Sequence, residues 1–162
     1  TVQGTTSNAT RGLAVEDTTA AILTFEESGL ATVTLSDAGV GPWAWELSSG
    51  ENPGRFPKHD TTTHLYAGRD GGLSLPDLSL WTYGPGGHWT DTLNHRTLEH
   101  GTGDTYIAQM EHFGAVVRGE SEPLVTCRDG ISNMHVVAAI KQSATTGRAV
   151  PLSELAQQED VA

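Results

Sequence analysis

The sequence has a single cysteine, Cys127, in 162 residues, and this scarcity excludes a framework of internal disulfides. One thiol in a chain of this length is typical of a reducing compartment, so the composition predicts a cytoplasmic protein. Cys127 has no cysteine partner for a zinc site and no local signature of a nucleophile. We interpret it as an incidental small residue near a helix start.

Long apolar runs and a basic surface are also absent. No segment approaches the roughly 20 apolar residues that a membrane helix needs. No secretion leader is visible, although the chain begins at Thr1 rather than at Met. Nine Lys and Arg stand against twenty Asp and Glu, for a net charge of −11. Such a surface repels phosphate backbones and anionic lipid, so we expect neither a nucleic-acid partner nor a membrane partner.

The chain is instead rich in glycine and in short segments that alternate apolar and polar residues. Residues 20–25 and 31–35 alternate on either side of "EESG", which predicts a β-hairpin. Further strands are predicted at "WAWELSS", "TTTHLYAG", "GLSLP", "LSLWTYG" and "HRTLEH". The Gly/Pro-rich segments "SGENPGRFPKHD" and "GPGGHWTD" are predicted to be loops that reach over a ligand or a neighbouring subunit.

From about Gly103 the apolar period becomes that of a helix. One helix is predicted where aromatic and aliphatic residues recur at helical spacing up to Gly119: Tyr106, Met110, Phe113 and Val117. A second helix is predicted between a capping box formed by Thr126 and Asp129 and a C-terminal cap at Gly147. Its apolar stripe is predicted to comprise Ile131, Met134, Ala138 and Ala144.

Strands followed by helices predict an α+β fold, with a single open, mainly antiparallel β-sheet and helices packed on one face. Residues 1–162 are expected to form one domain, with residues 153–162 as a short helical turn or a frayed tail. A sheet with apolar side chains on both faces would expose a large patch to water. We therefore expect a homo-oligomer that forms through the open sheet face.

Three stretches occur in a characteristic order: "VEDTTAAILTFEESGLATVTLS", then "LYAGRDGGLSLP" followed by "LWTYG", and last "HFGAVVRGESEPLVTCRDGISNMHVVAAIKQSATTGRAVPL". They place an acidic residue before a strand, a Tyr-x-Gly-x-x-Gly turn before a Leu-rich strand, and a capped Asp-Gly helix before Ser-Ala-x-x-Gly-Arg. Over residues 15–152 this order resembles the C-terminal domain of the glucose–fructose oxidoreductase / inositol dehydrogenase / rhizopine-catabolism family (Gfo/Idh/MocA).

The resemblance implies a two-domain parent enzyme. In such an enzyme an N-terminal Rossmann domain binds NAD or NADP, and the sheet of the second domain covers the substrate pocket near the nicotinamide. The open face of that sheet makes subunit contacts. The reaction that the resemblance implies is hydride transfer at a carbinol carbon of a sugar, inositol or related polyol.

The nucleotide-binding part of that pattern is missing. No G-x-G-x-x-G lies on a strand-to-helix turn, and the family's Glu-Lys-Pro motif is absent, because the two lysines are Lys58 after Pro57 and Lys141 in a predicted helix. We therefore expect no Rossmann domain, no cofactor and no catalytic residue in this chain, which by itself is not an enzyme. The alternative is a free-standing, non-catalytic sugar-binding or assembly module of the same fold.

A further match is interpreted as coincidence. The family carries an Asp-x-x-x-His pair on a helix, and "DTTTH" at residues 60–64 has the same spacing. Here the β-branched run predicts a strand, in which residues four apart are stretched well apart.

Four aromatic side chains are the candidates for contact with a substrate: His88, Trp89, Trp43 and Trp45. Aromatic rings stack on sugar faces, and a core or interface role is the alternative reading. Trp43 and Trp45 are predicted to point to one face of a strand. No metal site is predicted, since the seven histidines show no ligand spacing; His95 and His100 are expected on opposite faces of a strand.

Overall fold

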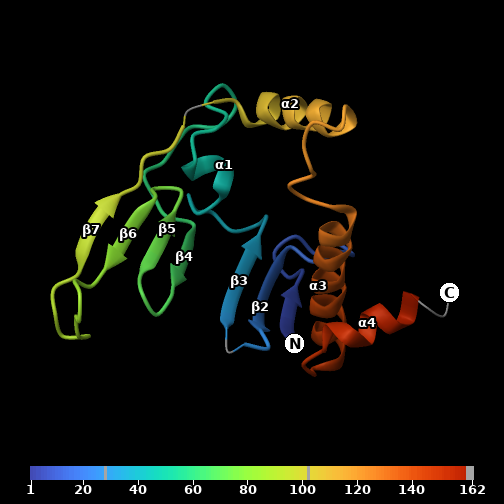
Figure 1. The fold of residues 1–162 in the computed structure, drawn as a ribbon. Coiled ribbons are helices and arrows are strands. Elements are labelled where there is room, and N and C mark those ends of the chain that lie inside the picture. Colours follow the sequence, from blue (N-terminus) through green and yellow to red (C-terminus); the bar gives the residue numbers. More distant parts are fainter. Residues whose placement is uncertain (28, 102, 160–162) are drawn as a thin grey trace. The chain divides into compact units, whose positions relative to one another are not determined.

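The computed structural model describes residues 1–27, 29–101 and 103–159 (Figure 1). The chain divides into two compact units. Residues 1–40 and 123–162 form the first unit, and residues 41–122 form the second. The first and last parts of the sequence therefore fold together, while the middle part is a separate body.

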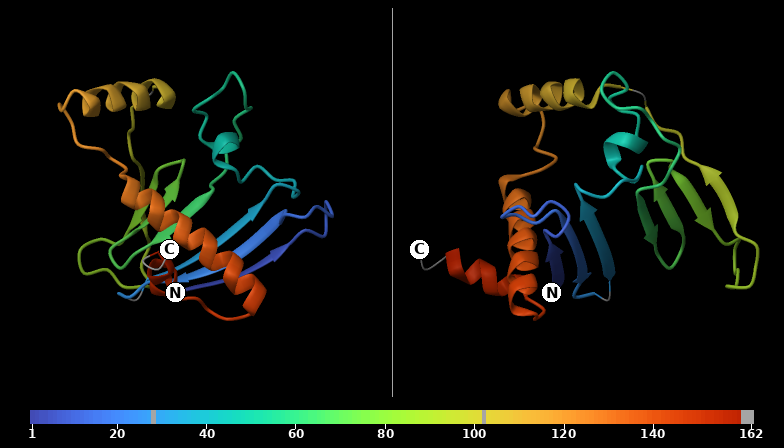
Figure 2. Two further views of the ribbon diagram at one scale, coloured as in Figure 1. Left: turned by 90° about the vertical axis from the view of Figure 1, so that its right-hand side faces the viewer. Right: turned by 180° about the vertical axis from the view of Figure 1, so that it is seen from behind.

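The first unit is a three-stranded antiparallel sheet with a long helix on one face (Figures 1 and 2). Its strands, in the order β1-β2-β3, are β1 (Val2–Ser7), β2 (Thr18–Thr24) and β3 (Leu30–Ser36). The helices are α3 (Cys127–Thr146) and α4 (Leu152–Glu159). The predicted hairpin is confirmed as β2 and β3, although Ser28 of its turn lies outside the described residues. Strand β1 was not predicted.

Helix α3 is held on β1 by a close approach at Gly4. A Cβ on Gly4 would lie 2.9 Å from Ile140 Cγ2, so only glycine lets the helix come this near. The Gly4 N–H donates to Ser143 Oγ at 2.9 Å. The core around this contact consists of Val2, Ala139 and Val150, packed against Leu23, Val136, Ile140, Leu152 and Leu155.

The sheet-facing stripe of α3 therefore differs from the predicted one. Ile131 and Met134, which we expected in the packed stripe, are exposed. The packed residues are Val136, Ala139 and Ile140. The predicted ends of α3 are confirmed: Thr126 and Asp129 form the capping box, and Gly147 adopts the left-handed conformation at φ 68°.

The acidic residue before β2 has a structural role. Asp17 is 4% exposed, and its Oδ2 accepts hydrogen bonds from the backbone N–H groups of Thr10 and Arg11. Its Oδ1 accepts from Thr18 Oγ1. The Arg11 N–H, together with these other donors, lowers the pKa of Asp17. The carboxylate thereby anchors the loop between β1 and β2.

The face of the sheet opposite α3 is mostly polar. Because side chains alternate along a strand, the β1 residues that alternate with Val2 and Gly4 are on this face, together with their cross-strand partners. They are largely hydroxyl-bearing residues with two large apolar ones among them: Gln3, Thr5, Ser7, Thr18, Ala20, Ile22, Thr24, Leu30, Thr32, Thr34 and Ser36.

The second unit contains a four-stranded antiparallel sheet in the order β4-β5-β6-β7 and two helices. Its elements are α1 (Trp45–Ser48), β4 (His64–Ala67), β5 (Gly72–Leu75), β6 (Ser79–Thr82), β7 (Asn94–Thr97) and α2 (Thr105–Val117). The strands predicted from "HLYA", "GLSL", "SLWT" and "HRT" are confirmed. His100 lies beyond β7, so the expectation that His95 and His100 share a strand was wrong.

The strand predicted at "WAWELSS" is wrong, because residues 45–48 form the short helix α1. The Ser48 hydroxyl donates to the carbonyl of Ala44 at 2.9 Å, and Glu46 lies in the first turn. These local interactions favour a helical turn over an extended segment. Trp43 and Trp45 therefore do not share one face of a strand.

Helix α2 is capped at its N-terminus by Asp104, whose Oδ1 accepts from the N–H groups of Tyr106 and Ile107. It is followed by Gly119 in the left-handed region at φ 73°, as predicted. None of its residues is buried. Its apolar stripe is exposed instead, at Tyr106, Ile107, Met110, Phe113 and Val117.

The α+β class with open antiparallel strands and helices is confirmed, and the strands form two sheets where the sequence led us to expect one. Helix α4 begins where a short helical turn was expected, and residues 160–162 lie outside the described part of the chain. Within the described residues, no helix combines the length and hydrophobicity needed to cross a bilayer.

Candidate functional site

A pocket of about 600 Å³ lies within the second unit. It is lined by residues around α1, by the turn between β5 and β6, and by the segment that leads into α2. Its charged or aromatic lining residues are Trp45, Glu51, Lys58, His100 and Asp104. We refer to this hollow as the Trp45 pocket.

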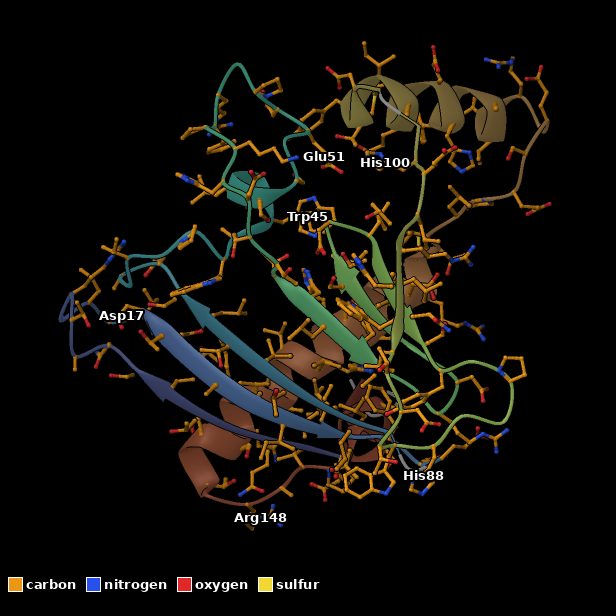
Figure 3. All side chains as sticks on the ribbon, turned by 90° about the vertical axis from the view of Figure 1, so that its left-hand side faces the viewer. Asp17, Trp45, Glu51, His88, His100 and Arg148 are labelled. Atoms are coloured by element: carbon orange, nitrogen blue, oxygen red, sulfur yellow. The ribbon has the colours of Figure 1, made fainter. Side chains whose placement is uncertain are left out.

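The orientation of Trp45 is fixed by a carboxylate (Figure 3). The indole Nε1–H donates to Glu51 Oε2 at 3.0 Å. Because Trp45 is the first residue of α1, the helical turn sets its direction, and the loop after α1 brings Glu51 back to it. The pair places an aromatic surface and a carboxylate side by side in the pocket.

A row of rings continues from Trp45 onto β4. The Trp45 and His64 rings meet edge to face with centroids 5.7 Å apart, and His64 stacks on Tyr66 at 6.4 Å with an interplanar angle of 8°. His64 Nδ1 is also 2.9 Å from Thr63 Oγ1. His64 therefore supports the position of Trp45, an arrangement typical of a preformed aromatic surface.

The "DTTTH" match has no helical counterpart in the structure. Residues 61–63 have no regular structure, and β4 begins at His64. The geometry thus agrees with the reading of this spacing as coincidence.

The turn between β5 and β6 forms another wall, through Leu75, Pro76 and Leu78. Asp77 fixes this turn, since its carboxylate accepts from Ser74 Oγ at 2.7 Å and from Thr62 Oγ1 at 3.0 Å. Hydrogen bonds from Ser79 first, and then from Ser74 and Thr62, lower the pKa of Asp77 to about 2. Asp77 therefore connects the turn both to Ser74 of β5 and to Thr62 in the segment before β4.

Lys58 supplies a cation to the pocket. Its aliphatic stem lies over Gly50, where a Cβ would be only 2.8 Å from Lys58 Cδ, and Gly50 has a positive φ of 74°. Among the described residues, no carboxylate lies within ion-pair distance of the Lys58 ammonium group. A second hollow of about 350 Å³ shares Lys58 and Pro76 with the Trp45 pocket.

The carbonyl group of Gly101 determines which ring nitrogen of His100 carries a proton. His100 Nδ1 is 2.9 Å from the carbonyl oxygen of Gly101. Because a carbonyl oxygen only accepts, Nδ1 carries the proton. In the neutral ring, Nε2 is then an acceptor.

The structure places only one of the four predicted substrate-facing residues, Trp45, on the pocket. Trp43 is 69% exposed and does not line it. His88 and Trp89 lie in the loop between β6 and β7. Figure 3 shows His88 away from Trp45. There the His88 N–H donates to Asp91 Oδ2 at 2.8 Å, the two rings are 5.9 Å apart, and Trp89 is 78% exposed. A substrate role for these three residues stays a prediction.

Sequence reasoning missed Glu51, Lys58, His100 and Asp104 as neighbours of Trp45. The one available signal was the Gly/Pro-rich segment "SGENPGRFPKHD", which was expected to reach over a ligand and which contains Glu51 and Lys58. Among the residues that the structure describes, no group of three or more His, Cys, Asp or Glu side chains is placed to hold a metal ion.

Residues 1–152 of the chain match a protein-family model, that of the C-terminal alpha/beta domain of an oxidoreductase family (Gfo/Idh/MocA). The chain belongs to this family. The resemblance stated from the sequence is thereby confirmed. No curated protein matches the sequence significantly.

Solved structures share the fold of this Gfo/Idh/MocA domain. An oxidoreductase from Agrobacterium radiobacter in complex with NAD+, L-tartaric acid and magnesium is 16% identical, with a TM-score of 0.61 over 95% of this chain and 43% of that chain. The putative oxidoreductase yvaA from Bacillus subtilis is 12% identical, with a TM-score of 0.64 over 92% and 44%. The WlbA dehydrogenase from Bordetella pertussis, in complex with NADH and UDP-GlcNAcA, is 15% identical, with a TM-score of 0.51 over 93% and 38%. The chain thus spans less than half of each.

Proposed function

We propose that this domain is the substrate-side and oligomerisation domain of an NAD(P)-dependent oxidoreductase that acts on a sugar, inositol or related polyol in the cytoplasm. The observation that carries the proposal is the family match over residues 1–152. It is supported by solved relatives with bound NAD+ or NADH that are more than twice as long as the matched part. NAD or NADP belongs to the full-length protein, and no cofactor is assigned to this chain.

The domain's own contribution is binding and orientation. Its Trp45 pocket offers an aromatic wall, carboxylates and an ammonium group, which are groups that bind hydroxyl-bearing molecules. The nicotinamide, when bound by the full-length protein, accepts or supplies the hydride. No residue of this chain is assigned a catalytic role, so the chain alone is expected to be inactive.

Calorimetric titration with NAD(H) and NADP(H) tests this division of labour. The described strands pair only antiparallel, and the sequence has no G-x-G-x-x-G turn, so we expect no heat of binding. A site with micromolar affinity would overturn the proposal that the nucleotide binds elsewhere.

A free-standing sugar-binding or assembly module is the second candidate function. Its candidate binding site is the Trp45 pocket, whose lining residues belong to this chain. The coding frame upstream of Thr1 separates the two functions. An open frame that encodes G-x-G-x-x-G and Glu-Lys-Pro supports the oxidoreductase, whereas a start codon directly before residue 1 supports the module.

A further inference from the structure

We infer that the Trp45 pocket is a binding site for an uncharged polyhydroxylated ring, and that Glu51 makes it reject the anionic form of such a ring. The inference shares the polyol class with the proposed function. It concerns residues of this chain alone and requires no nucleotide, so its test and the nucleotide titration can fail independently.

The size and the wall of the pocket fit one such ring. Its volume of about 600 Å³ lies within the range of roughly 300–1,000 Å³ that is usual for small-molecule sites. Trp45, Leu75, Pro76 and Leu78 provide apolar surface, against which the C–H face of a sugar or cyclitol packs. His64 and Glu51 hold the indole, so little ordering is required when the ring binds.

The polar groups match hydroxyls rather than a single charge. Glu51 uses Oε2 for the Trp45 indole, which leaves Oε1 to accept from a ligand hydroxyl. Lys58 donates, and His100 in its neutral form can accept at Nε2, since Nδ1 already donates to the Gly101 carbonyl. A ring with neighbouring hydroxyls both donates and accepts, and it can satisfy all three groups.

The charges of the lining residues disfavour an anion. Glu51 and Asp104 carry two negative charges, whereas Lys58 carries one positive charge. Asp104 is committed to α2 through Tyr106 and Ile107, so its charge stays in place. A carboxylate on the ligand would be repelled by both acids, with the effect reduced by solvent because the pocket is open to water.

The indole N–H signals of the four tryptophans, in proton–nitrogen correlation spectra of the 162-residue chain, provide the test. Loss of one signal in Trp45→Phe identifies Trp45. We expect myo-inositol and D-glucose to shift this signal at millimolar concentrations. D-Glucuronate should bind about tenfold more weakly because its carboxylate is repelled, and a tenfold difference in affinity corresponds to about 1.4 kcal/mol.

Two substitutions test the role of charge. Glu51→Gln keeps an oxygen for the indole N–H and removes the charge, so we expect weaker glucose binding and a glucuronate-to-glucose difference reduced to about twofold. Glu46→Gln is the matched control, because Glu46 lies on α1 and does not line the pocket. Lys58→Met should act in the opposite direction and enlarge the discrimination against glucuronate.

Three results would overturn the inference. The first is a Trp45 signal that does not move with either neutral ring in a spectrum whose other signals are dispersed. The second is a glucuronate affinity equal to that for glucose in the unsubstituted chain. The third is an equal effect of Glu46→Gln and Glu51→Gln, which would indicate a general effect of charge rather than a pocket.

Discussion

At the scale of single residues, Ser143 shows how one hydroxyl joins two elements. It is fully buried, its Oγ accepts from the Gly4 N–H, and it donates to the Arg148 carbonyl at 2.6 Å. In Ser143→Ala both backbone groups lose their partner inside the protein. We expect the free energy of unfolding to fall by about 1–3 kcal/mol, measured by urea unfolding.

The control for this substitution is Ser132→Ala on the same helix. Ser132 is exposed, and its Oγ donates to the Arg128 carbonyl within the helix. Its replacement should change the free energy by no more than about 0.5 kcal/mol. Equal effects of the two substitutions would contradict the proposed link between β1 and α3.

The lowered pKa of Asp77 makes the free energy of unfolding depend on pH. Its pKa is about 2 in the folded protein and 3.8 in the unfolded chain, because Ser79, Ser74 and Thr62 donate to the carboxylate. The folded pKa is the lower one, so the contribution is present above about pH 4 and is lost as the pH falls towards 2. The exposure of the side chain reduces it to about 1 kcal/mol.

Acid unfolding followed by tryptophan fluorescence measures this contribution. Asp77→Asn should lower the stability at neutral pH and flatten its decline between about pH 4 and pH 2. Asp70→Asn is the control, because the Asp70 side chain is 90% exposed and pairs with Arg69 on the surface. An unchanged acid profile in Asp77→Asn would show that these hydroxyl contacts do not stabilise the fold.

The residues of the pocket show where prediction from sequence ends. Trp45 was a candidate because aromatic rings stack on sugar faces. Glu51, Lys58 and His100 became its neighbours only through the path of residues 49–58 and the turn before α2. Such long-range placement depends on tertiary packing, which local patterns do not contain.

At the scale of elements, the contact between β1 and α3 depends on Gly4. A Cβ there would lie 2.9 Å from Ile140 Cγ2 and 3.2 Å from the Ile140 carbonyl oxygen, and the latter cannot move without the helix backbone. Gly4→Ala should therefore destabilise the protein by about 1–3 kcal/mol in urea unfolding.

The matched control is Gly54→Ala. A Cβ at Gly54 would have no neighbour within 4 Å, and the residue lies in a loop. This substitution should be neutral or slightly stabilising, since alanine restricts the unfolded chain. If Gly4→Ala behaved in the same way, α3 would not require the close approach.

The elements that were predicted correctly carry their signals locally. The β2–β3 hairpin alternates apolar and polar residues, and α3 has both its capping box and its terminal glycine in the sequence. Helix α1 was misread because "WAWELSS" alternates like a strand, although the Ser48 hydroxyl bonds back to Ala44. Strand β1 was missed because its pairing partners lie in β2 and, at Val2, in Val150 near the other end of the chain.

At the scale of the whole molecule, large apolar side chains are exposed on α2. Tyr106, Met110 and Phe113 are each more than half exposed. A surface of this kind is typical of a part that is covered by other protein.

Self-association through the open face of the β1–β3 sheet remains our proposal, although this face is mostly polar and carries two large apolar residues, Ile22 and Leu30. Ile22 lies on this face and is 48% exposed. In a two-fold interface, the same residue of both copies comes into the contact, so Ile22→Glu introduces two like charges into a chain that already carries −11. We expect sedimentation to show a dimer or larger species for the unsubstituted chain and a shift towards monomer for Ile22→Glu.

Ile107→Glu is the matched control, since Ile107 on α2 is also a partly exposed isoleucine, at 59%. It should leave the association unchanged if the sheet face is the interface, because α2 belongs to the other unit. Dissociation by Ile107→Glu alone would move the interface to α2. A clean monomer of the unsubstituted chain at high concentration would contradict self-association through either surface, and the exposed apolar residues would then require a different protein segment to cover them.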